Sequence, residues 1–137
     1  MGARSKARKR ALDVLYGADV RGESINEALA AEALRAAADP KRASSWDYAR
    51  TIVAGVAEHG DEIDELIETY AQGWSIPRMP AVDRALLRIG VWEILFNDEV
   101  PDSVAIAEAV ESAGAHSTDD SAGFVNGLLG RIAATRA

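Results

Sequence analysis

The sequence has no cysteine and few of the other residues that build metal or catalytic sites. Without cysteine it cannot form disulfides or thiolate-bound zinc and iron–sulfur centres. The two histidines, His59 and His116, are far apart in the sequence and match no metal-ligand spacing. No glycine-rich phosphate loop of the dinucleotide-binding or Walker type occurs. We therefore expect no metal, no cofactor and no enzymatic activity.

Long hydrophobic runs are also absent. No apolar stretch approaches the roughly 18 residues that a membrane-spanning helix needs. The basic amino terminus lacks the hydrophobic core of a signal peptide, because Asp13, Asp19 and Arg21 interrupt it. We expect a cytoplasmic protein with no membrane contact.

Proline is scarce, with only four in the chain, and no segment alternates apolar and polar residues as a strand does. Alanine-rich segments with helical spacing lie between the prolines, so the sequence predicts a single all-α domain over residues 1–137. Ser24 and Glu27 form a capping-box pattern. The expected helices cover residues 4–19, a segment from Ser24 towards Asp39, residues 45–72, residues 81–97, a segment from Asp102 or Ser103, and a segment from about residue 118.

Two of these helices have distinctive patterns. Apolar residues follow the helix 45–72 at steps of three and four, and His59 lies in that series, which favours a packed core histidine. An acidic run covers the opposite face. The helix 81–97 is apolar on most sides, which predicts a central position in the fold.

Charge is distributed unevenly. The net charge is -7, yet five of the 15 basic residues fall within the first ten positions, where there is no acid. The rest of the chain therefore holds ten basic and 22 acidic residues. A basic end on an acidic body indicates a local nucleic-acid footprint or a solubilising tail, and charge alone does not separate the two. The five residues are Arg4, Lys6, Arg8, Lys9 and Arg10.

The first and last helices suggest an RNA site. Arg4 and Arg8 fall near the apolar stripe of the first helix, while Lys6, Lys9 and Arg10 point outward. Guanidinium groups at a projecting helix end can bind phosphates or stack on bases, and Phe124 offers an aromatic face for an unstacked base.

Two further patterns near the carboxyl end have a structural and a functional interpretation. His116, Ser117 and Asp119 are close in sequence, but a helix cap explains them better than a catalytic triad does. Gly123, Gly127 and Gly130 favour a close helix–helix approach, with close approach of a nucleic acid as the alternative.

Several short motifs, in this order and spacing, resemble those of the NusB family of transcription antitermination factors along nearly the whole chain. They are Ala7-Arg8, Ala11-Leu12, Leu15-Tyr16, Ala54-Gly55-Val56, VDRALLRI at 82–89 with Glu93, Val100-Pro101, AIAEA at 105–109, Asp120-Ser121 and FVNG at 124–127.

The resemblance implies two stacked three-helix bundles and a factor that binds the boxA segment of ribosomal RNA leaders with the ribosomal protein NusE, in support of RNA polymerase. It implies an RNA surface and a partner surface, and it leaves open whether the free protein is a monomer or a homodimer. The implied RNA-binding residues are Arg4, Lys6, Arg8, Tyr16, Phe124 and Asn126, and the partner-binding residues are Asp83 and Glu93.

Two alternatives remain. A related helical domain is the amino-terminal RNA-binding module of some ribosomal RNA cytosine methyltransferases, although a chain ending at Ala137 leaves no room for the methyltransferase part. The other alternative is a protein-binding adaptor or a self-associating helical protein whose acidic face is its function.

Overall fold

The computed structural model describes residues 2–136, apart from the side chain of Arg42. This part of the chain is helical and contains no strand, as expected. None of its helices combines the length and apolar character needed to cross a membrane. The elements are α1 (Ala3–Arg21), α2 (Ile25–Ala38), α3 (Pro40–Glu58), α4 (Gly60–Tyr70), the 3-10 helix η1 (Ile76–Arg78), α5 (Ala81–Phe96), α6 (Asp102–His116) and α7 (Ser121–Ala134).

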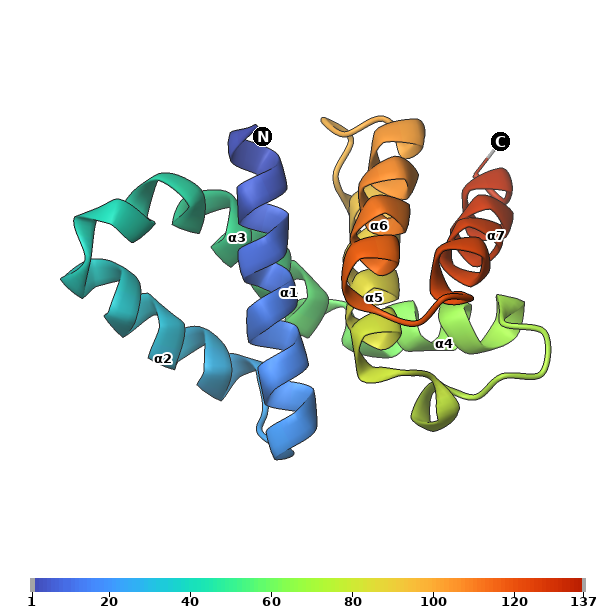
Figure 1. The fold of residues 1–137 in the computed structure, drawn as a ribbon, viewed down its shortest axis with the longest axis horizontal. Helices are drawn as coiled ribbons and strands as arrows, with labels where there is room; N and C mark the ends of the chain where they lie inside the picture. The colour runs from blue at the N-terminus through green and yellow to red at the C-terminus, as the bar shows by residue number, and fades with distance from the viewer. Residues whose placement is uncertain (1, 137) are drawn as a thin grey trace.

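The helices form two groups (Figure 1). Helices α1, α2 and α3 pack on one another, and α5, α6 and α7 form the second group, with α4 against α5 and α7. Helix α5 joins the groups because both α1 and α3 pack on it. This agrees with the two stacked bundles that the resemblance implied.

The expected long helix over residues 45–72 is wrong in its start and in its continuity. Helix α3 begins five residues earlier, at Pro40, where the side chain of Asp39 accepts a hydrogen bond from the amide of Lys41 at 3.0 Å. The helix then ends at Glu58, because His59 has non-helical angles (φ -106°, ψ 20°), and α4 starts anew at Gly60. The imidazole of His59 stacks on Phe96 with ring centroids 3.8 Å apart, yet its side chain is 27% exposed. It packs on the core without being buried in it.

Helix α5 is central, as its all-round apolar pattern predicts. Most of its residues are buried, among them the two acids Asp83 and Glu93. Burying a carboxylate costs free energy unless it has an ion-pair or hydrogen-bond partner. The partners of Asp83 and Glu93 therefore help to fix the position of α5.

Close helix–helix approach occurs at glycines other than those expected. A Cβ on Gly55 would lie 2.0 Å from the indole nitrogen of Trp92, and one on Gly90 would lie 2.7 Å from a methyl of Leu129. By contrast, a Cβ on Gly123 or Gly130 would meet nothing within 4 Å. The favoured interpretation of the last-helix glycines was therefore wrong, because the tight contacts join α3 to α5 and α5 to α7.

Candidate nucleic-acid interface

The basic start of α1 is largely neutralised by the acidic body of the protein. The ammonium of Lys9 lies 2.7 Å from Asp13, and a guanidinium nitrogen of Arg10 lies 2.8 Å from Glu32. Lys6 is exposed, and its ammonium forms no ion pair or hydrogen bond within residues 2–136. The positive charge that the start of α1 presents to solvent is therefore much smaller than the five charges expected from the sequence.

Arg4 is held only loosely. It pairs with Glu99 at 3.3 Å, and the two side chains are 48% and 78% exposed. Its guanidinium carbon lies 4.7 Å from the centroid of the Tyr48 ring. Because exposed ion pairs contribute about 0–1 kcal/mol, Arg4 can exchange Glu99 for a phosphate at little cost. The Tyr48 ring would keep the guanidinium oriented during that exchange.

Arg8 is buried instead of projecting. Its guanidinium makes a bidentate pair with Glu93, with N–O distances of 2.9 Å for both Nε–Oε1 and Nη2–Oε2. The remaining nitrogen, Nη1, donates to Glu108 at 3.1 Å. A phosphate contact from Arg8 would require one of these pairs to open.

Tyr48 completes this buried network, because its hydroxyl donates to Glu93 and accepts a hydrogen bond from Asn97 at 3.1 Å. Burial would lower the pKa of Arg8, but its hydrogen bond to Glu93 and the charge of that carboxylate outweigh burial and raise it. Burial raises the pKa of Tyr48, and the bond to Glu93 raises it further. Arg8 therefore stays charged and Tyr48 stays a donor, so Glu93 is fully engaged.

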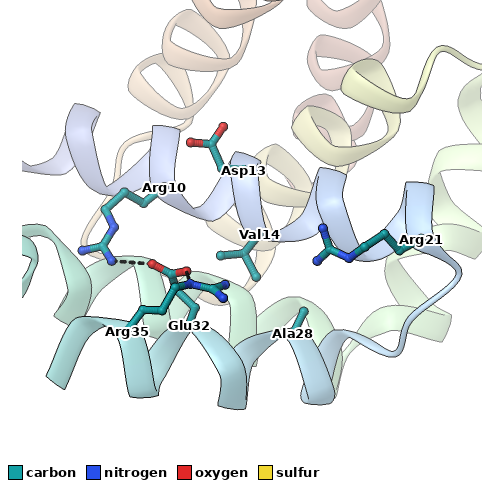
Figure 2. Close-up of a pocket in the computed structure, with 7 residues that line it drawn as sticks. All are labelled: Arg10, Asp13, Val14, Arg21, Ala28, Glu32 and Arg35. Atoms are coloured by element: carbon teal, nitrogen blue, oxygen red, sulfur yellow. Dashed lines mark hydrogen bonds and ion pairs between the residues drawn. The ribbon is translucent and has the colours of Figure 1, made fainter. Parts of the chain in front are cut away.

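A second group of cations lines a groove of about 420 Å³ between α1 and α2 (Figure 2). Arg10 from α1 and Arg35 from α2 converge on the buried carboxylate of Glu32, each at 2.8 Å. Burial would raise the pKa of Glu32, but the bonds from Arg10 and Arg35 outweigh it and lower it. Arg10 thus ties α1 to α2 and does not point outward as expected.

The remaining expected RNA residues lie on α1 and α7. Tyr16 is 40% exposed, and Asn126 is exposed. Phe124 is half-buried against the core, with its ring 6.5 Å from that of Trp74. All three can be reached by a ligand.

Asp83 anchors the loop between α6 and α7. The hydroxyls of Ser117 and Ser121 donate to its two carboxylate oxygens at 2.5 and 2.9 Å. Asp83 is only 2% exposed. The expected partner-binding residues Asp83 and Glu93 are therefore both buried and engaged within the chain. The hydroxyl of Ser117 is likewise occupied, and no hydrogen bond links it to His116 or Asp119 in the described structure.

The two halves of the expected RNA site do not touch. Arg8 packs beside Glu93, towards the end of α5, whereas Phe124 shares a pocket with Asp83 at its start. These two acids are ten positions apart, which corresponds to about 15 Å along a helix. A groove of about 300 Å³ runs between α1 and α6 from Arg8 to His116 and leads from one end towards the other.

Two residues of this surface were not singled out from the sequence. Tyr48 orients Arg4 and Glu93 from α3, and no sequence signal points to it, because its partners are distant in the chain. Trp74 stands beside Phe124 and is 54% exposed. The sequence signal for Trp74 was its place directly after Gly73, in the segment between the expected helices 45–72 and 81–97.

Comparison with known proteins shows the family of this chain. The NusB family model matches residues 5–134. Transcription antitermination protein NusB of Clavibacter sepedonicus is 67% identical to this chain, and the alignment covers 100% of both proteins. Transcription antitermination protein NusB of Leifsonia xyli subsp. xyli is 70% identical, and the alignment covers 97% of this chain and 92% of the relative. A chain in a crystal structure of the antitermination factors NusB and NusE in complex with double-stranded RNA is 31% identical, with a TM-score of 0.82 and 97% of each chain covered. These names describe transcription factors and not enzymes.

Proposed function

Since the chain belongs to the NusB family, we propose that it is a transcription antitermination factor that binds boxA-type RNA together with the ribosomal protein NusE. The observation that carries the proposal is the match over residues 5–134, which includes the motifs on α1, α5 and α7. We take residues 1–137 as one RNA-binding domain that acts in the cytoplasm, as part of an RNA polymerase antitermination complex. The proposal holds for a free protein that is either a monomer or a homodimer.

The proposed RNA surface runs from the start of α1 to the start of α7. Arg4 and Lys6 supply phosphate contacts at one end, because both are exposed there. Phe124 offers a base a π-face at the other end, near Asn126, and Tyr16 adds an exposed aromatic on α1.

The proposed partner surface must rely on exposed acids. Asp83 and Glu93 are buried and bonded to residues of this chain, so they would stabilise α5 without contacting the partner directly. Exposed carboxylates nearby on α4, such as Glu62 and Glu65, can complement a basic partner. The proposed partner surface therefore lies on α4, which packs against α5.

Lys6→Ala tests the phosphate contacts. We expect weaker binding to single-stranded RNAs of any sequence, and a log–log salt slope that is shallower by about 0.7, because one counterion-releasing contact is lost. Fluorescence anisotropy at several salt concentrations measures both quantities. The matched control is Lys41→Ala, an exposed lysine at the α2–α3 turn on the far side of α1 from α6, and it should change neither (Figure 1). Equal salt slopes for Lys6→Ala and the wild type would show that the start of α1 is not part of the RNA site.

The wild-type slope also reports on Arg8. Two phosphate contacts, from Arg4 and Lys6, give a slope of about -1.4, and a third contact gives about -2.1. We propose that Arg8 adds the third contact only if RNA binding opens its pair with Glu108, the more exposed of its two acids.

A further inference from the structure

An open pocket lies between the segment before α5 and the start of α7. Its volume is about 270 Å³, and its walls include Trp74, Met79, Pro80, Thr118, Asp120 and Phe124. The rings of Trp74 and Phe124 are 6.5 Å apart with an interplanar angle of 63°, so they meet edge to face and form two different walls.

Trp74 is exposed to an unusual degree. It is 54% exposed, whereas Trp46 and Trp92 are 8% and 6% exposed. Tryptophan carries a large apolar surface, and leaving half of it in water forgoes stabilisation that burial would give. An exposed tryptophan beside a second aromatic therefore indicates a binding surface.

The backbone holds Trp74 in this position. The two residues before it have left-handed φ angles, 53° at Gln72 and 96° at Gly73. The segment after it is fixed because Ile76 and Met79 are buried and the guanidinium of Arg84 donates to the carbonyl of Met79 at 2.8 Å. Arg84 is itself fixed by Asp19 at 2.7 Å. A main chain held in place before binding loses little conformational entropy when a ligand arrives.

We propose that Trp74 is a second base-stacking residue, and that one unpaired nucleobase of the bound RNA enters the pocket that Trp74 and Phe124 line and stacks on the exposed face of Trp74. This inference rests on the proposed RNA-binding function and adds a position to it. A base fits the pocket better than a phosphate does, because the carboxylate of Asp120 at the rim repels anions but not a neutral ring. The pocket is also continuous with Phe124, the aromatic end of the proposed RNA surface.

The test compares Trp74→Ala, Trp74→Phe and the control Leu34→Ala, which removes an exposed apolar side chain on α2. The probe is a single-stranded boxA-type RNA of twelve nucleotides. Trp74→Ala should weaken binding by about 5- to 150-fold with an unchanged salt slope, because stacking releases no counterions. Trp74→Phe should stay close to wild type, since it keeps an aromatic face, and Leu34→Ala should have no effect.

Fluorescence gives a second measurement. Because Trp46 and Trp92 are buried, RNA should quench mainly the emission of Trp74, and Trp74→Phe should abolish that quenching. With 2-aminopurine placed at successive RNA positions, one position should be quenched by the wild type but not by Trp74→Ala.

The outcomes separate this inference from the function on which it rests. If Lys6→Ala weakens RNA binding but Trp74→Ala does not, the base pocket is wrong and the RNA site stands. If Trp74→Ala lowers only the affinity for NusE, the pocket binds protein and the inference is equally overturned. If the wild-type chain binds no RNA with or without NusE, both the inference and the proposed function fail.

Discussion

Glu93→Ala is expected to lower the free energy of unfolding by about 3–5 kcal/mol, the usual cost of removing one member of a buried ion pair. The variant leaves the guanidinium of Arg8 buried with only Glu108, and it removes the acceptor of the Tyr48 hydroxyl. Urea denaturation followed by circular dichroism measures the change.

Glu99→Ala is the matched control, because Glu99 also pairs with an α1 arginine but at the surface, and it should cost less than about 1 kcal/mol. In the double variant Arg8→Met/Glu93→Leu, much of the lost stability should return, since neither charge is then left buried alone. A loss below 1 kcal/mol for Glu93→Ala would show that this carboxylate is free to serve a partner.

Asp83→Lys is expected to be comparably damaging, with a loss of at least about 3 kcal/mol. Lysine at this 2% exposed position would be buried without an acid, and the hydroxyls of Ser117 and Ser121 would lose their acceptor. The loop before α7 should detach, which denaturation and proteolysis of residues 117–121 would detect.

The control for this charge reversal is Asp47→Lys on the exposed face of α3, outside the proposed partner surface, which should change stability by no more than about 0.5 kcal/mol. Weaker binding of NusE by Asp83→Lys places the partner at Asp83 only if it exceeds the loss of folded protein. If Asp83→Lys is as stable as the wild type, the anchoring role of Asp83 is wrong.

The helices were largely predictable because their signals are local. Gly22 ends α1 in a left-handed conformation, Ser24 accepts from the amide of Glu27, and prolines bound α5 and α6. The exceptions are the start of α3 at Pro40 and the break at His59, where apolar spacing continues through the turn. Apolar periodicity shows which residues face the core. The spacing continues when two consecutive helices bury the same side, so it does not reveal the break between them.

The environment of the charged residues could not be predicted, because it depends on contacts between distant positions. Arg8 meets Glu93 85 residues later, and Asp83 meets Ser117 34 residues later. The motifs that identify the family therefore contain residues that hold the fold as well as residues exposed for binding. Exposure, which the sequence does not give, separates Arg4 and Lys6 from Arg8.

This chain and NusE are expected to bind boxA-type RNA together, and the most direct measurement is the dissociation constant of the wild-type chain for that RNA with and without NusE. We expect salt-dependent binding by the chain alone, with a log–log slope between about -1.4 and -2.1, and tighter binding when NusE is present. RNA affinity that is absent in both conditions, or that does not depend on salt, would contradict the account.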